Sequence, residues 1–201
     1  MTEDFLSSLI LASGSPRRKA LLRDLGLSLK IIPAEINEIA DANEPPTSFA
    51  KRMAREKAGL IARLHPERWV LGADTVVALN GRMYGKPKND RQAMAFLQDL
   101  SGKTHQVITG FCLCHKKNRI AFAKSVRTQV TFKILSRQEI KWYVRTEEPR
   151  DKAGAYAIQG QGAFCIQKIR GSYTNVVGLP VSEVLEALEK YAGFRLGRKL
   201  A

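Results

Sequence analysis

The chain has 201 residues, 44% of them hydrophobic, which suffices for one substantial core but is short for two, so we expect a single domain over residues 1–201. No apolar run approaches the roughly 20 residues of a transmembrane helix, and Glu3 and Asp4 stand where a secretory signal needs positive charge, so we expect a soluble, cytoplasmic protein without a membrane partner. The formal net charge of +14 fits nucleic acid, an acidic membrane or a phosphate-rich small molecule equally well and excludes none of them.

The N-terminal half alternates strands and helices. An apolar run at residues 9–12 predicts a strand, and the helix after it has Ser15 as N-cap, Pro16 at its first position and Gly26 as terminator. The further elements expected are a strand at 29–32, a helix at 48–64, a buried strand at 69–79, and a hairpin through Asn80 and Gly81 to a return strand at 82–84.

The C-terminal half continues this alternation. Asp90 opens a helix that Gly102 closes, and Ser136 with Glu139 forms a capping box at the start of another helix. The other expected elements are strands at 106–113, 121–132 and 163–169, a polar loop at 146–152 and a last helix at 181–191. This order predicts an α/β fold, with a mixed, twisted sheet flanked by helices.

Arg17 and Arg18 occupy the first turn of the first helix, where exposed N–H groups and the helix dipole already present positive charge. Two cations at such a place favour the binding of an anion. Together with the backbone of the loop around Ser13, they predict a phosphate-binding site. The alternative is two solvated arginines on an amphipathic helix, and Gly14 with its flanking serines favours phosphate binding over it.

Two charged residues interrupt apolar patterns. Lys57 falls near the middle of the apolar arc of the helix at 48–64, where its amine must meet an anion or extend to solvent. Asp74 interrupts the strand at 69–79, so it must bind a metal, meet a cation or lie at a cleft. Gly72 just before it lets another group approach the backbone closely. A purely structural salt bridge to a core-facing lysine is the alternative.

Glu38, in an acidic loop, and Lys86, between Gly85 and Pro87, complete the charged set, although neither stands out alone. Cations and carboxylates from separate elements of one sheet are the inventory for phosphoryl chemistry with a divalent metal. The sequence has no Walker A motif, no Rossmann glycine fingerprint and no serine nucleophile elbow. Ordinary NTPases, dehydrogenases and serine hydrolases are therefore disfavoured.

A series of motifs resembles the Maf family of nucleotide pyrophosphatases along nearly the whole chain. The motifs are Leu11-Ala-Ser-Gly-Ser-Pro-Arg-Arg18, Ala54-Arg-Glu-Lys-Ala58, Gly72-Ala-Asp-Thr-Val76, Gly85-Lys-Pro87, Leu100-Ser-Gly-Lys-Thr-His-Gln-Val107, Asp151-Lys-Ala-Gly-Ala-Tyr156, Ile158-Gln-Gly160, Gly171-Ser-Tyr173 and Val177-Gly-Leu-Pro180. Each motif alone is a weak signal. Their occurrence together in this order is highly specific.

The resemblance implies a fold shared with inosine triphosphate pyrophosphatases, a homodimer, and a cleft that binds a nucleoside triphosphate with Mg²⁺ or Mn²⁺. It makes Asp74 the proton acceptor for the attacking water, and Glu38 and Asp74 the metal ligands. Whether Asp74 acts as base or chiefly as metal ligand stays open, because both roles need an ionised carboxylate there. The resemblance assigns the phosphate site to Ser13, Arg18, Lys57 and Lys86.

Within this family, Arg17, Thr75 and Gln159 resemble the branch that hydrolyses dTTP and UTP to the monophosphate and pyrophosphate. The Gln amide offers a donor and an acceptor to a pyrimidine edge. Ala157 departs from the branch, which commonly has Gly there. The alternatives are a 7-methyl-GTP pyrophosphatase of the same family, and a non-catalytic basic protein that regulates cell division or binds nucleic acid. No specific nucleic acid is expected as a partner of the enzyme.

Overall fold

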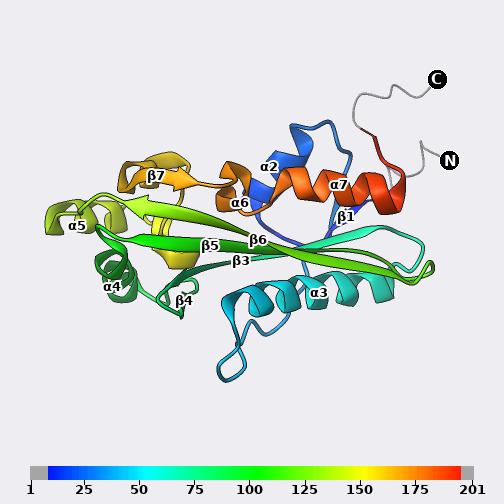
Figure 1. Cartoon of the computed structure of the whole chain (residues 1–201), viewed down its shortest axis with the longest axis horizontal. Helices are drawn as coiled ribbons and strands as arrows, with labels where there is room; N and C mark the ends of the chain where they lie inside the picture. Colours follow the sequence, from blue (N-terminus) through cyan, green and yellow to red (C-terminus); the bar gives the residue numbers. More distant parts are fainter. Residues whose placement is uncertain (1–8, 196–201) are drawn as a thin grey trace. The chain divides into compact units, whose positions relative to one another are not determined.

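The computed structural model describes residues 9–195, so Glu3 and Asp4 lie outside it (Figure 1). The strands are β1 (Ile10–Leu11), β2 (Lys30–Ile31), β3 (Val70–Leu79), β4 (Arg82–Tyr84), β5 (Thr104–His115), β6 (Ile120–Phe132) and β7 (Ile166–Arg170). The α-helices are α2 (Pro16–Arg23), α3 (Pro46–Leu64), α4 (Asp90–Leu100), α5 (Arg137–Arg145), α6 (Tyr173–Val177) and α7 (Val181–Ala192). Between α5 and β7 lie the 3-10 helices η1 (Glu148–Asp151), η2 (Ala153–Ala155) and η3 (Gly160–Cys165). Over the described range, none of the helices has the length and apolar character to cross a membrane.

The strands join in one mixed sheet. Within residues 9–195 their order is β2-β1-β3-β5-β6-β7, and β4 pairs with β3 off this path. β1 runs parallel to β2 and β3, whereas the pairs β3–β4 and β6–β7 are antiparallel. With helices packed against it, this sheet confirms the predicted mixed α/β fold.

Contacts between residues divide the chain into two compact units. In their described parts, the first unit contains residues 9–74, 109–126 and 178–195, and the second contains 75–108 and 127–177. The boundary falls inside three strands, so β3, β5 and β6 each carry residues of both units. In β3, Asp74 is the last residue of the first unit and Thr75 the first residue of the second.

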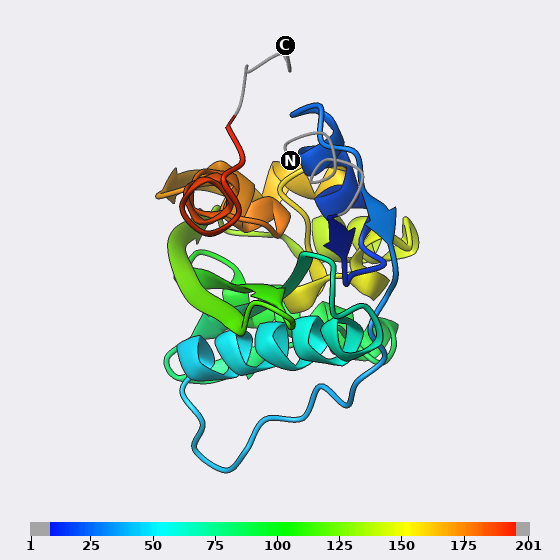
Figure 2. The ribbon, with the colours of Figure 1, turned by 90° about the vertical axis from the view of Figure 1, so that its right-hand side faces the viewer.

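In the first unit, helices cover both faces of the strands (Figures 1 and 2). Since alternate strand residues point to opposite faces, neighbours such as Val70 and Leu71 enter different cores. Val70 packs in a cluster with Ala58 and Ile61 of α3. Leu71 packs in another with residues of α2 and α7, such as Leu188. The buried side of α3, which carries most of its apolar arc, is therefore the face that meets the sheet, whereas Leu64 at the end of the helix is exposed.

In the second unit, one apolar core joins α4, α5 and the ends of the strands. His105 is buried in this core, where its ring lies edge-on to Phe132 and its Nε2 is 2.7 Å from the Tyr156 hydroxyl. Burial lowers the pKa of His105 to about 4, so the ring is neutral at pH 7. His105 thus ties the segment after α4 to the segment around Tyr156.

Most predicted elements are present, with some differences. The polar loop predicted at 146–152 contains the 3-10 helix η1. The helix predicted at 48–64 begins at Pro46, because proline suits the first helical turn, which needs no backbone donor. The strand predicted at 163–169 is wrong at its start, since residues up to Cys165 form η3 and β7 begins at Ile166. The short helix α6 was not predicted.

Candidate functional site

A buried ion pair between Lys57 and Asp74 forms the centre of the candidate site. Asp74, in β3, is 5% exposed and Lys57, in α3, is 7% exposed. The Lys57 Nζ lies 2.6 Å from Asp74 Oδ1. Each charge would be costly to bury alone, and the pairing offsets part of that cost. Lys57 therefore meets an anion rather than extending to solvent, and Asp74 meets a cation.

Gly72 explains how α3 comes so close to β3. A Cβ at this position would lie 2.4 Å from the carbonyl oxygen of Ala54 and 2.7 Å from the backbone nitrogen of Ala58. Only glycine leaves room for a backbone at such distances. The predicted close approach is confirmed, and the approaching group is helix α3, which carries Lys57 to the strand.

Glu38 brings a second carboxylate to the same lysine. It lies between β2 and α3, and its Oε1 is 2.6 Å from the Lys57 Nζ. Its side chain is 44% exposed, so this side of the pair faces solvent. Glu44 of the same acidic loop accepts a hydrogen bond of 2.8 Å from the Arg52 Nε instead. The two carboxylates of this loop therefore pair with different cations, Glu38 with Lys57 and Glu44 with Arg52.

Arg18 holds the site together from within the protein. Its Nε donates to the carbonyl oxygen of Gly178 at 2.7 Å, and its Nη1 donates to Ser13 Oγ and to the carbonyl oxygen of Ala73 at 3.0 Å each. Burial lowers the pKa of Arg18, which Asp74 opposes and the neighbouring charge of Arg17 reinforces. Arg18 thus fixes Ser13 and the residue before Asp74.

Ser15 caps α2 as predicted, with its hydroxyl accepting from the backbone nitrogen of Arg18 at 3.5 Å. Arg17 is half-buried in the same first turn, which contains no acidic residue. The positive charge expected at this helix start is therefore present. Phosphate binding by Ser13, Arg17 and Arg18 stays a prediction.

Thr75, Lys86 and Gln159 lie in the second unit. Thr75 follows Asp74 in the strand, so the two side chains point to opposite faces of the sheet. Lys86 and Gln159 are exposed. The segments next to them are tied together, because the backbone nitrogen of Gly154 donates to the carbonyl oxygen of Gly85 at 3.0 Å. Their convergence with Asp74 in one cleft stays a prediction.

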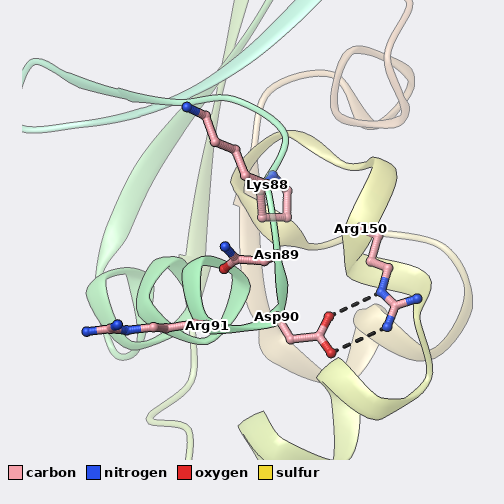
Figure 3. A pocket seen from close by; sticks show the side chains of 6 residues that line it. Lys88, Asn89, Asp90, Arg91 and Arg150 are labelled. Carbon is pink, nitrogen blue, oxygen red and sulfur yellow. Dashed lines mark hydrogen bonds and ion pairs between the residues drawn. The ribbon is translucent and has the colours of Figure 1, made fainter.

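An open pocket of about 640 Å³ lies at the segment directly after Lys86, where α4 begins (Figure 3). Its lining residues are Pro87, Lys88, Asn89, Asp90, Arg91 and Arg150. The Arg150 guanidinium faces the Asp90 carboxylate and donates from Nε to Oδ1 at 3.1 Å and from Nη2 to Oδ2 at 3.4 Å. This ion pair fastens η1 to the start of α4. The lining contains none of the predicted site residues.

Glu38 and Asp74 are the two carboxylates of this site that could hold a divalent cation. One oxygen of each carboxylate lies 2.6 Å from the Lys57 Nζ, so the two oxygens lie close together around the ammonium group. Mg²⁺ prefers oxygen ligands and often takes one or two carboxylates together with substrate phosphates and water. Within residues 9–195, no group of three or more His, Cys, Asp or Glu could hold a metal. The donors fit a cation that the substrate helps to bind.

Sequence reasoning missed the carbonyl groups that hold Arg18. Gly178 belongs to a motif quoted above, but nothing in its side chain indicates that its carbonyl oxygen accepts from an arginine 160 positions away. Nothing in the sequence indicates that the Ala73 carbonyl oxygen accepts from Arg18 either. Carbonyl acceptors are present at every residue, so only the fold shows which of them are used.

The chain matches known proteins over most of its length. A family model described as Maf-like protein matches residues 8–191. The dTTP/UTP pyrophosphatase of Syntrophus aciditrophicus (strain SB) is 52% identical over 181 residues, which cover 90% of this chain and 88% of that protein. The dTTP/UTP pyrophosphatase of Myxococcus xanthus (strain DK1622) is 47% identical over 182 residues, 90% of this chain and 91% of that protein.

Among solved structures, the chain is similar to a HAM1 protein from Coxiella burnetii. The TM-score is 0.49 and the sequence identity 16%, with 90% of this chain and 98% of that chain covered. The Ham1 protein of Staphylococcus aureus gives a TM-score of 0.44 at 14% identity, over 62% of this chain and 71% of that chain.

Proposed function

Because this chain belongs to the Maf family, we propose that it is a pyrophosphatase that acts on dTTP and UTP. It hydrolyses the bond between the α- and β-phosphates and releases the nucleoside monophosphate and pyrophosphate. Relatives named dTTP/UTP pyrophosphatase support this substrate class, at 52% and 44% identity over 90% and 92% of the chain. The observation that carries the proposal is the buried Asp74 carboxylate beside Lys57 and Glu38.

Asp74 is the group proposed to act on the attacking water. As the water oxygen attacks the α-phosphorus, its proton passes to the Asp74 carboxylate and pyrophosphate leaves. Lys57 compensates the charge of this carboxylate at 2.6 Å and contributes positive charge beside the phosphates. Burial of both groups strengthens these interactions, since the local dielectric is low.

The phosphate-binding roles fall to Ser13, Arg18, Lys57 and Lys86. Three N–H groups of Arg18 already bind protein acceptors, so this residue supplies charge and holds the Ser13 hydroxyl in place. Lys86 is exposed, and its ammonium group is proposed to bind a phosphate oxygen.

A divalent cation, Mg²⁺ or Mn²⁺, is part of this proposal. When bound it would neutralise phosphate charge and polarise a phosphoryl oxygen. Glu38 and Asp74 are the residues proposed to hold it, and Lys57 lies between their carboxylates.

Arg17, Thr75 and Gln159 are proposed to select the base. The exposed Gln159 amide can donate to and accept from a pyrimidine edge, which suits uracil and thymine. A homodimer in the cytoplasm completes the proposal and is tested by sedimentation and by cell fractionation.

The test incubates the purified protein with a panel of triphosphates, including dTTP, UTP, CTP and 7-methyl-GTP, with Mg²⁺ or Mn²⁺ and with EDTA. We expect monophosphate and pyrophosphate from dTTP and UTP, and no turnover in EDTA. Asp74→Asn should lower kcat by roughly 10²–10⁴-fold, the usual contribution of a general base. Asp24→Asn removes the same charge at the exposed end of α2 and should leave kcat unchanged.

Three results would contradict the proposal. Release of diphosphate and phosphate would indicate a different bond cleaved. Preference for 7-methyl-GTP would favour the sister activity. Salt-dependent nucleic-acid binding that survives Asp74→Asn, without turnover of any triphosphate, would favour a basic binding protein.

A further inference from the structure

The segment that carries Gln159 is held by one acidic side chain. We call residues 157–162 the Gln159 loop. The Glu148 carboxylate accepts from the backbone nitrogens of Gln161, at 3.0 Å to Oε2, and of Gly162, at 3.0 Å to Oε1. Backbone N–H groups bonded to a carboxylate make stronger hydrogen bonds than those bonded to a neutral acceptor. Two consecutive N–H groups of the loop are thus fixed on one charged group.

Tyr143 extends this contact to the other end of the loop. Its hydroxyl donates to Glu148 Oε1 at 2.9 Å and accepts from the backbone nitrogen of Ala157 at 3.2 Å. Tyr143 is fully buried in α5. Burial, and then the bond to Glu148, raises the pKa of the Tyr143 hydroxyl, so it remains a donor at neutral pH. Together the two side chains bind the loop on both sides of Gln159.

Two glycines let the loop lie against these groups. A Cβ at Gly160 would lie 2.7 Å from a Glu148 carboxylate oxygen, and a Cβ at Gly162 would lie 2.2 Å from the Tyr143 hydroxyl oxygen. Gly160 also has a φ of +69°, which favours glycine. The loop therefore has glycine at the two positions where it lies closest to Glu148 and Tyr143, which we call the clamp.

The clamp is itself anchored. Glu148 begins η1, and Arg150 of the same helix pairs with Asp90 at 3.1 Å (Figure 3). A long exposed glutamine loses side-chain freedom when it binds a ligand, and a fixed backbone reduces the remaining cost of placing its amide.

We propose that Glu148 is a positioning residue for substrate choice: with the Tyr143 hydroxyl, it holds the Gln159 loop in the conformation that presents the Gln159 amide to the pyrimidine base. This inference rests on the proposed function, because Gln159 reads a base only if the protein binds a nucleotide. Glu148 has no proposed role in phosphate binding or in the chemical step at Asp74. Its effect is therefore expected on substrate affinity and selectivity.

The test compares Glu148→Gln and Tyr143→Phe with the wild-type protein. Glutamine keeps the shape of Glu148 but replaces one acceptor oxygen by a donor, which opposes the backbone N–H group that faces it. We expect KM for dTTP and UTP to rise about tenfold with kcat within about twofold of wild type. The preference for UTP over CTP should fall by a similar factor.

Glu147→Gln is the matched control. It removes the same charge one residue earlier, where the carboxylate binds Arg150 and makes no bond to the loop among the described contacts. This variant should keep the wild-type KM and selectivity. Hydrogen exchange gives a readout independent of turnover: the amides of Gln161 and Gly162 should exchange faster in Glu148→Gln than in Glu147→Gln.

The outcomes separate the two proposals. Unchanged KM, selectivity and amide exchange in both Glu148→Gln and Tyr143→Phe overturn the role of Glu148, while turnover by wild type leaves the enzyme proposal standing. The role of Glu148 is also overturned if kcat falls equally for every nucleotide while KM stays unchanged. That result would show only that a smaller fraction of the variant is folded. If wild type hydrolyses neither dTTP nor UTP, the proposed function fails and this role fails with it, even where the amides are protected. Should Glu148→Gln not fold, Tyr143→Phe decides alone.

Discussion

Lys57 is a charged residue on the apolar face of α3, and its position predicted a compensating group. Its position on the apolar arc of α3 required a compensating anion or a route to solvent. In the fold it lies between Asp74 and Glu38, at 2.6 Å from each. A purely structural salt bridge would need only one carboxylate. The second, 44% exposed carboxylate gives the cluster an open side, which suits a site that admits a ligand.

Gly72→Ala should destabilise the protein by about 3 kcal/mol, the upper end of the range for overpacking. The reason is that its Cβ would lie 2.4 Å from a backbone oxygen of α3, which cannot move without shifting the helix. Gly59→Ala is the control, since its Cβ meets nothing closer than 4.0 Å and the helix gains roughly 0.5–1 kcal/mol. Urea unfolding measures both, and equal midpoints would show that α3 does not rest on Gly72.

At the scale of elements, the part of the chain from α5 to β7 differs most from expectation. The sequence pattern predicted a strand from residue 163, whereas η3 runs from Gly160 to Cys165. The N–H groups of Gln161 and Gly162 bind the Glu148 carboxylate instead of a neighbouring strand. Both residues precede the predicted strand, and the 3-10 helix that contains them continues to Cys165, so β7 begins only at Ile166.

The capping box of α5 is an element-scale feature that the sequence predicted correctly. Ser136 Oγ accepts from the backbone nitrogen of Glu139 at 3.2 Å, and Glu139 Oε2 accepts from that of Ser136 at 2.7 Å. Lys133, hydrogen-bonded to Glu139, lowers the pKa of this carboxyl to about 2, so the box stays charged at neutral pH.

Ser136→Ala should lower the free energy of unfolding by about 1 kcal/mol, because a backbone donor of α5 loses its cap. Ser182→Ala, at an exposed position in the first turn of α7, should change it by less than about 0.5 kcal/mol. Thermal and urea unfolding of the two variants provide the comparison. If Ser182→Ala costs as much as Ser136→Ala, the loss does not arise from the cap.

At the scale of the whole molecule, the question is whether the two units unfold together. The first unit has an apolar core on each face of its strands and the second unit has one, and three strands carry residues of both units. The single domain expected from chain length stays a prediction. Covalent continuity through β3, β5 and β6 favours it, because melting a strand in one unit removes its extension in the other.

The two tryptophans test this, since Trp69 lies in the first unit and Trp142 in the second. In Trp142→Phe the fluorescence reports Trp69, and in Trp69→Phe it reports Trp142. We expect one cooperative transition, so that fluorescence and far-UV circular dichroism give the same urea midpoint within each variant. A fluorescence midpoint that differs from the circular dichroism midpoint in either variant would show two domains that unfold separately.

Much of the fold follows from local signals in the sequence. Ser15, Pro16 and the box at Ser136 set helix starts, and the alternation of apolar residues sets the strands, because caps and periodicity act between near neighbours. The charged residues that had to be explained, Lys57 and Asp74, are also visible locally as breaks in an apolar pattern.

The tertiary structure alone decided which groups meet. No local rule pairs Lys57 with Glu38, gives Arg18 the carbonyl of Gly178, or directs Glu148 to the Gln159 loop. These contacts join residues far apart in sequence, and their partners are carbonyls, amides and carboxylates that occur throughout any chain. Local sequence patterns set the elements and the charges that need compensation, whereas long-range packing selects the compensating group from many chemically equivalent ones.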